Sequence, residues 1–218
     1  MPGEILSYEE MCDREKTRLV KGINFSLGDR HSIVLMSRAP DAKYDDKFLE
    51  NDTVLIYDGH DVPQTGGIDT KSVDQRERTP KGTLTQNGRF HEAAQQFKAG
   101  EGTAERVKVY ENLGGANWIY HGDFFLTDSE YVSNGKRKVF KFKLTAHDGT
   151  KFTVKELNEI PLRAVLPSSI MTKVLEQNGR RCHECGNEHN LTFQHAGPNS
   201  IAIDNVHIVC NNHNISIK

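Results

Sequence analysis

The chain has 218 residues, of which 27% are charged and 36% hydrophobic, a composition typical of a globular protein with one large domain or two small ones. No apolar run approaches the roughly 18 residues that a membrane-spanning helix needs, and the N-terminus is acidic, unlike a signal peptide. We therefore expect a cytoplasmic protein with no membrane partner. The formal net charge of -2 neither favours nor excludes nucleic acid, because binding depends on where the positive charges lie.

A capping-box pattern marks the first predicted element. Ser7 is followed three residues later by Glu10, and Met11 and Leu19 recur at loosely helical spacing. We therefore predict an N-terminal helix within residues 1–21, which begins at Ser7 and ends near residue 21.

Short apolar runs bounded by turn residues come next, and they predict strands. These strands are expected at residues 32–36, 53–57, 106–110, 123–132 and 138–146. In the last of them Phe140, Phe142 and Leu144 alternate with Lys141 and Lys143, which indicates one buried face and one basic, solvent-exposed face.

A long polar stretch from residue 58 to residue 84 separates the second and third strands, and loops of this length are more often functional or mobile than structural filler. Phe90, Ala94 and Phe97 then recur at helical spacing before Gly100, so a second helix is expected there. Five strands, two helices and long loops predict an α+β or mostly-β, barrel-like domain to about residue 146.

Prolines interrupt the chain after residue 146 and predict a connector over residues 147–167, with Pro161 and Pro167 as breakers. Ser168 is expected to cap a helix that Asn178 and Gly179 end. A second, small domain is therefore predicted at residues 168–218.

Three of the four cysteines lie in this last segment, and only Cys12 lies far upstream. Cys182-x-x-Cys185 and Cys210-x-x-His213 form two pairs with matched spacing. Thiolates and a neutral imidazole suit tetrahedral Zn²⁺, and four protein ligands make such a site structural rather than catalytic. The alternatives for the fourth ligand are His183, His189 and His207, and the alternative for the whole pattern is two accidental cysteine pairs.

Between the two metal-binding pairs lie Leu191-Thr-Phe-Gln-His195 and Asp204-Asn205-Val-His-Ile-Val-Cys210, and Asn214 follows the second pair. This order resembles the HNH (ββα-metal) endonuclease motif in its zinc-bound form, where a hairpin and a helix surround one divalent cation. The resemblance implies that His195 is the general base, that Asn205 holds the hairpin loop, and that Asn214 is a ligand of catalytic Mg²⁺ or Mn²⁺. Phosphodiester hydrolysis needs hydroxide near neutral pH and a positive charge beside the departing oxygen.

Two positions depart from the family pattern. Gln194 precedes the general base where the family usually has an acidic metal ligand, and the last motif position is Asn214 rather than His. Both residues offer neutral oxygens, so they would hold a hard cation weakly, and the scissile phosphate would contribute more. The alternative is a zinc-stabilised module of the same kind that no longer cuts.

A series of short motifs occurs in order between residues 22 and 146. It includes Gly28-Asp-Arg-His, Tyr44-Asp45-Asp46, Tyr57-Asp-Gly, Thr65-Gly66-Gly67, Arg106-Val-Lys-Val-Tyr and Tyr120-His-Gly-Asp. The series resembles the SRA (YDG) domain, which binds 5-modified cytosine in DNA by flipping the base out of the duplex. The resemblance implies a twisted, PUA-like β-barrel with flanking helices, and double-stranded DNA with modified cytosine as the partner.

The resemblance also implies roles for the matched side chains. A flipped base must recover its lost stacking, and Tyr44 and Tyr57 match the two aromatic rings that enclose it. Cytosine carries an exocyclic amine, which is a donor, so a carboxylate acceptor is expected, and Asp46, or else Asp45, is the candidate. Without a ligand, the two tyrosines would be half-buried strand residues and the two acids would cap turns.

Three further segments are candidates for contacts with the DNA. Thr65 and Gly66 would let the backbone approach the sugar or phosphate of the flipped nucleotide. Residues 64–84 and 86–90 are candidates for entering the duplex to fill the vacated space. Residues 136–155 hold seven Lys or Arg and one Asp, and they are the best candidates for phosphate contacts.

Together the two resemblances predict a modification-dependent (type IV-like) restriction endonuclease, which binds 5-methylcytosine or 5-hydroxymethylcytosine and cuts a nearby phosphodiester bond. One ββα site cuts one strand, so a homodimer is plausible for a double-strand break. The alternatives are a non-catalytic reader of modified DNA and an HNH nickase without specificity for the modified base.

Overall fold

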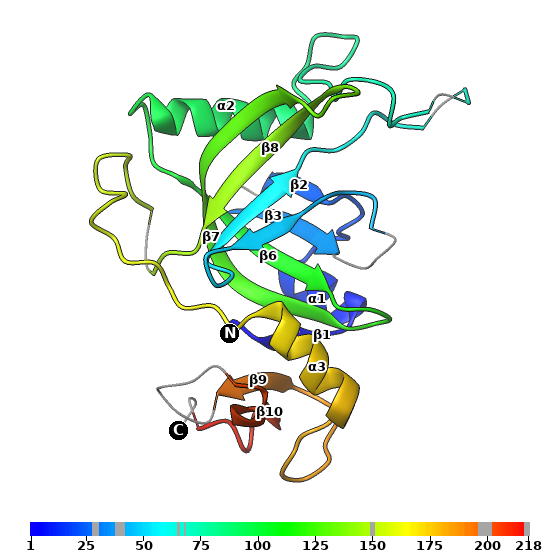
Figure 1. Ribbon diagram of the computed structural model, residues 1–218, viewed down its shortest axis with the longest axis vertical. Helices are drawn as coiled ribbons and strands as arrows, with labels where there is room; N and C mark the ends of the chain where they lie inside the picture. Colours follow the sequence, from blue (N-terminus) through cyan, green and yellow to red (C-terminus); the bar gives the residue numbers. More distant parts are fainter. Residues whose placement is uncertain are drawn as a thin grey trace.

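The computed structural model describes residues 1–27, 31–37, 42–64, 66–67, 69–148, 151–195 and 202–215. These residues form a mixed α+β fold with ten strands in one sheet, three α-helices and one short 3-10 helix (Figure 1). The helices are α1 (Tyr8–Glu15), α2 (Gln86–Lys98), α3 (Ser168–Asn178) and the 3-10 helix η1 (Ile203–Asn205). The strands are β1 (Glu4–Leu6), β2 (Ile23–Leu27), β3 (His31–Ser37), β4 (Lys47–Leu49), β5 (Val54–Asp58), β6 (Glu105–Asn112), β7 (Trp118–Ser133), β8 (Lys138–Thr145), β9 (Leu191–His195) and β10 (Val206–Cys210).

The sheet runs in the order β10-β9-β1-β7-β6-β3-β2, and β8, β5 and β4 extend it from β7 as a second branch. Strands β3 and β6 are parallel, and the other pairs are antiparallel. The 16-residue strand β7 pairs with β6 along its first half and with β8 along its second half, so it belongs to both branches. The α+β prediction is confirmed, and in the described part of the chain the strand pairs leave β2, β4 and β10 as open edges.

Alternation along β8 explains how the core forms. Phe140, Phe142 and Leu144 are fully buried, whereas Lys143 is exposed, as the sequence pattern predicts. Helix α2 covers this face, and its Phe90 ring lies 5.4 Å from the ring of Phe142 in an edge-to-face contact. All five predicted strands are present within one to five residues of their expected ends.

Helix α1 begins as predicted and ends earlier than predicted. Ser7 Oγ accepts the Glu10 N–H at 3.1 Å and Glu10 Oε2 accepts the Ser7 N–H at 2.7 Å, which is a complete capping box. Lys16 takes a left-handed conformation with φ 54° and ends the helix, so the expectation of a helix to about residue 21 is wrong. The Lys16 N–H donates to the Asp13 carbonyl oxygen at 3.2 Å at this end of the helix, and the buried Glu15 carboxylate pairs with Lys108 at 2.8 Å.

Strand β1, which was not predicted, links the N-terminal and C-terminal parts of the sheet. One edge of β1 pairs with β7, where Glu4 lies opposite Tyr120, and the other edge pairs with β9, where Ile5 lies opposite Leu191. The two predicted domains therefore share one continuous sheet (Figure 1). The predicted domain boundaries themselves remain predictions.

A buried polar cluster anchors the start of α3. Pro167 is the N-cap residue, and Ser168 is the first residue of the helix rather than its cap, which corrects the prediction. The Ser168 hydroxyl instead donates to Glu111 at 2.6 Å, its N–H donates to Asp52 at 2.9 Å, and His121 lies 2.8 Å from the same Glu111 oxygen. This cluster ties α3 to β6 and β7. No helix among the described residues is both long enough and apolar enough to span a bilayer.

Candidate functional site

Two tyrosines and a histidine gather where β5 ends. Tyr57 lies on β5 and is only 2% exposed, and its hydroxyl donates to the carbonyl oxygen of Leu35 at 3.0 Å. Tyr44 precedes β4, is half-buried, and accepts the Asp61 N–H at 3.3 Å. The ring of His60 lies 5.9 Å from the ring of Tyr44 and 6.3 Å from that of Tyr57. The fold thus brings both predicted aromatic residues around one imidazole.

Of the two candidate acids, Asp46 is the buried one. Its side chain is 8% exposed, and its Oδ1 accepts the Asp58 N–H at 2.8 Å. Burial raises the pKa of Asp46 to about 7, although the Asp58 N–H acts in the opposite direction. Asp45 is exposed and forms an ion pair with Lys47 at 2.6 Å. Asp46 is therefore the better placed acceptor.

Ion pairs hold the following loop next to Tyr44. Asp61 pairs with Lys71 at 2.8 Å and also with Arg137, whose guanidinium donates to the Val73 carbonyl oxygen at 2.9 Å. Lys71 Nζ lies 4.3 Å from the centre of the Tyr44 ring, a cation–π contact. These contacts fix one side of the Tyr44 ring.

The glycine turn of the same loop is open to solvent. Gly66 and Gly67 have φ of 63° and 73°, and a Cβ on either would meet no atom within 4 Å. Such a turn leaves room for a ligand to approach the backbone. Thr65 and residues 28–30 of the first motif lie outside the described residues.

The two segments that were expected to enter a duplex differ in exposure. Asn87, Gly88 and Phe90 are buried in the first turns of α2 and Arg89 is exposed, so entry of residues 86–90 into a duplex stays a prediction for which only Arg89 is accessible within this segment. Within residues 64–84, Arg78 to Leu84 form a tight exposed turn, the teal loop above α2 in Figure 1, with the Thr79 N–H donating to the Thr83 carbonyl oxygen at 2.8 Å. This second segment can reach a ligand.

The basic stretch 136–155 contains two kinds of cations. Arg137 and Lys141 are paired with Asp61 and Asp58 and serve the fold. The exposed cations of the stretch are Lys136, Lys138, Lys143, Lys151 and Lys155.

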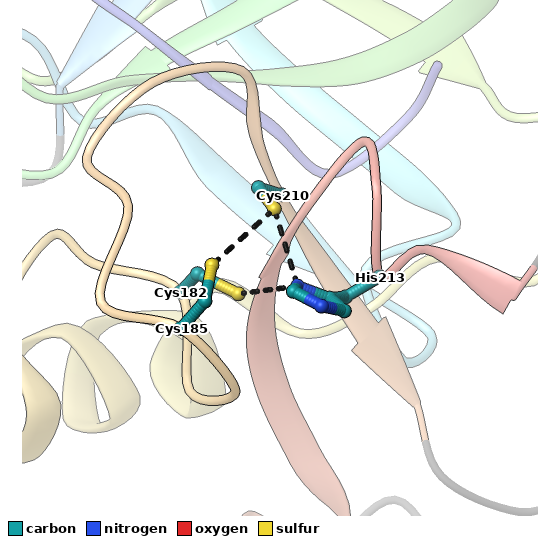
Figure 2. A group of neighbouring side chains, drawn as sticks. All are labelled: Cys182, Cys185, Cys210 and His213. Atoms are coloured by element: carbon teal, nitrogen blue, oxygen red, sulfur yellow. Dashed lines mark hydrogen bonds between the residues drawn. The ribbon is translucent and has the colours of Figure 1, made fainter.

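Cys182, Cys185, Cys210 and His213 form a cluster that could hold a metal ion, and their donor atoms all lie within 4.8 Å of one another (Figure 2). Cys185 Sγ lies 3.8 Å from Cys210 Sγ, and His213 Nδ1 lies 3.4 Å from Cys210 Sγ. A tetrahedral zinc ion with Zn–S distances of about 2.3 Å places its sulfur ligands about 3.8 Å apart, so the donor set fits that ion.

The local backbone prepares this cluster for a cation. Gly186, with φ 72°, closes the turn after Cys185, and its N–H donates to the Cys182 carbonyl oxygen at 2.9 Å. Burial of the Cys182 thiol opposes its ionisation, but N–H groups of Cys210 and neighbouring residues outweigh burial and lower the pKa of Cys182 to about 6. The other candidate ligands, His183 and His207, stack on each other at 4.7 Å instead.

The residues of the nuclease motif lie on the β9–β10 hairpin. His195 lies opposite Val206, which directly follows Asn205, so His195 and Asn205 come to the same end of the hairpin. Gln194 lies opposite His207. His195, Asn205 and Gln194 are half-buried, whereas Asn214 is only 2% exposed.

The described residues show the hairpin and the cysteine–histidine cluster, and residues 211–213 form a turn directly after β10. Within the described ranges, the cysteine–histidine cluster is the one group of three or more His, Cys, Asp or Glu side chains whose donor atoms lie this close together. A catalytic cation at Gln194 and Asn214 would therefore depend on amide oxygens.

No protein-family model matches the chain, and no curated protein matches its sequence. Similar solved structures include the SUVH5 SRA domain in complex with fully methylated CG DNA, at 22% identity over 68% of this chain and 90% of that chain, with a TM-score of 0.45. SUVH9 is similar at 19% identity, over 82% of this chain and 32% of that chain, with a TM-score of 0.42. The DNA modification-dependent restriction endonuclease AspBHI is similar at 12% identity, over 63% and 66% of the two chains, with a TM-score of 0.40.

Proposed function

We propose that the protein is a modification-dependent DNA endonuclease. It binds a flipped 5-methylcytosine or 5-hydroxymethylcytosine in double-stranded DNA and hydrolyses a nearby phosphodiester bond. The observation that carries this proposal is the meeting of Tyr44, Tyr57 and the buried Asp46 at one place, from segments that are separate in the sequence.

This group has the chemistry that a flipped cytosine needs. Two aromatic rings replace the stacking that the base loses when it leaves the duplex. Asp46 Oδ1 accepts the Asp58 N–H, so Oδ2 is the oxygen that accepts from the exocyclic amine of cytosine. Thymine carries an acceptor at this position and would be repelled.

The surroundings of the group offer contacts to the sugar-phosphate backbone. The open turn at Gly66 and Gly67 admits the flipped nucleotide, and the exposed turn from Arg78 to Leu84 is the segment that fills the vacated space in the duplex. Lys136 and Lys143 are exposed and bind phosphates without reading sequence.

The C-terminal hairpin supplies the proposed cleavage chemistry. The half-buried His195 takes a proton from the attacking water, and Asn205 holds the hairpin loop that orients it. A bound Mg²⁺ or Mn²⁺, held by Gln194 and Asn214, would neutralise charge on the departing oxygen. The cysteine–histidine cluster holds structural Zn²⁺, which braces the other end of the hairpin.

Binding and digestion of matched DNA substrates test this function. Purified protein is mixed with Mg²⁺ or Mn²⁺ and with duplexes that carry cytosine, 5-methylcytosine or 5-hydroxymethylcytosine. We expect tighter binding and cleavage of a modified duplex only, and we expect His195→Ala to abolish cleavage while binding is kept. Equal binding and cleavage of all three duplexes would instead support a nickase without specificity for the base.

A non-catalytic reader of modified DNA is the second candidate. Gln194 replaces an acidic ligand, and Asn214 is buried, so both features weaken the proposed cation site. Selective binding without cleavage under every metal condition would favour this reader. Double-strand cleavage by the endonuclease would require a second copy of the chain, which sedimentation on modified DNA would detect.

A further inference from the structure

The imidazole of His60 is enclosed on several sides. Besides its two ring contacts with tyrosines, His60 Nε2 lies 3.3 Å from the Tyr57 hydroxyl. Because that hydroxyl donates to Leu35, the imidazole N–H is the donor in this contact. A Cβ on Gly22 would lie 2.5 Å from His60 Nε2, so only glycine leaves room for the ring.

The backbone of His60 is held more firmly than its side chain. Its N–H donates to Asn87 Oδ1 at 2.8 Å, and its carbonyl oxygen accepts from Asn87 Nδ2 at the same distance. Asn87 is buried in the first turn of α2, so this pair of hydrogen bonds is shielded from water. Among the described residues, the one hydrogen bond of the ring is the long contact with Tyr57. Rotation about the side-chain bonds can therefore move the ring while the backbone stays in place.

The ring also carries no charge that would have to be moved. Burial lowers the pKa of His60 to about 4, so the imidazole is neutral near pH 7. The residue as a whole is half-buried rather than fully buried.

We infer that His60 is a displaceable plug of the base pocket. In the free protein its imidazole occupies the space beside Tyr44 and Tyr57 that the flipped cytosine needs, and it rotates out when the base enters. This inference depends on the proposed function, because it assigns the residue that competes with the base for that site. The plug acts in specificity, since a base that stacks poorly or lacks a donor for Asp46 cannot displace it.

Removing the plug tests the inference by binding. If His60 fills the pocket in most free molecules, only the remaining fraction can bind DNA, and the measured affinity is lowered by that fraction. His60→Ala should therefore bind a 5-methylcytosine duplex at least about threefold more tightly than the wild type. His147→Ala is the matched control, because His147 also packs between aromatic rings, those of Phe125 and Phe152, away from the proposed pocket. The control should leave the binding constant unchanged. Unchanged or weaker binding by a folded His60→Ala variant would overturn the plug.

The wild-type protein gives a second readout that needs no substitution. Nuclear Overhauser effects between the His60 ring and the rings of Tyr44 and Tyr57 should be present in the free protein and lost when it is saturated with modified duplex. Their persistence in the complex would overturn the plug while the proposed function stands. Equal binding of modified and unmodified duplexes by the wild type, with no further loss in Tyr44→Ala, would instead refute the proposed function, and the plug with it.

Discussion

Asp46 is an acid whose ionisation and burial oppose each other. Its pKa of about 7 lies far above the usual value for Asp, which is about 3.9. Near neutral pH the side chain is therefore divided between a protonated form, whose O–H is a donor, and a carboxylate, which only accepts. The cytosine amine needs the acceptor, so the proposed pocket should work better in the ionised form.

Discrimination against thymine should therefore increase from pH 6 to pH 8. The quantity to measure is the ratio of the dissociation constants for duplexes that carry thymine or 5-methylcytosine at the same position, because both bases have the 5-methyl group and general changes in phosphate binding cancel in that ratio. Asp46→Asn, which cannot ionise, should show a lower ratio that does not change with pH. A wild-type ratio that is constant across this range would contradict the role of Asp46 as the acceptor.

The same pKa predicts how Asp46 affects stability. Because the folded value is raised above the unfolded one, the contribution of this group to stability is present below about pH 4 and is lost as the pH rises through about 7. Asp46→Asn keeps an oxygen for the Asp58 N–H and cannot ionise. The unfolding temperature of the variant minus that of the wild type should therefore be larger at pH 8 than at pH 4. An equal difference in unfolding temperature at both pH values would show that the pKa of Asp46 is not raised by folding.

The sequence predicts part of this site and not the rest, for physical reasons. Tyr44, Asp46 and Tyr57 belong to short motifs, and the apolar run of β5 predicts the strand that carries Tyr57. His60 follows β5 in a polar loop, where a single histidine has no periodic pattern to indicate burial. Its position depends on Asn87, which lies 27 residues away, and such long-range hydrogen bonds leave no local signal.

Strand β1 is a whole element that the sequence does not predict. Three residues are too few to show the alternation that identifies a strand, and this one is stabilised by its two neighbours, β7 and β9. The longer strands β7 and β8 were predictable because apolar runs mark both of them, and in β8 Phe140, Phe142 and Leu144 alternate with Lys141 and Lys143. The early end of α1 was not predictable, because the left-handed residue that ends it is Lys16 and not a glycine.

Ile5 tests how much β1 contributes. Its side chain is 2% exposed and packs in the same core cluster as Leu191 and Met171. Ile5→Ala should lower the free energy of unfolding by about 2–5 kcal/mol, as is usual for truncating a buried aliphatic side chain. Urea denaturation measures this loss, and Val20→Ala, at a position 77% exposed, is the control expected to be nearly neutral. A near-neutral Ile5→Ala variant would mean that β1 does not join the two parts of the sheet in solution.

Metal removal should affect the C-terminal elements first. Three thiols and an imidazole whose donor atoms lie within 4.8 Å of one another can bind a cation, and the cation would compensate the charge of the clustered thiolates. A chelator should therefore increase hydrogen exchange in β9 and β10 before it affects β6 to β8. Cys210→Ser should lose the bound zinc, whereas Cys12→Ser, outside the cluster, should keep one equivalent. Protection of β9 and β10 that survives chelation would show that the cluster does not stabilise the hairpin.

The continuous sheet also bears on how binding is coupled to cleavage. The proposed base pocket lies at the end of β5, and the nuclease motif lies on β9 and β10. Backbone hydrogen bonds through β8, β7 and β1 join these strands, and the cluster around Ser168 adds a second connection between α3 and the central strands. The connector 147–167 is therefore one of several links between the two sites.

This arrangement predicts that the cleavage position is set by the sheet and not by the length of the connector. Inserting four Gly or Ser residues between Asn158 and Glu159, which are both exposed, should leave the distance from the modified cytosine to the cut unchanged. Removing residues 2–6, and with them β1, should broaden the distribution of cuts while selective binding is kept. Sequencing the cleaved ends of a duplex with one modified site measures both effects. A cut that moves with the insertion would mean that the two parts act as tethered domains, because a flexible link then controls which phosphodiester reaches His195.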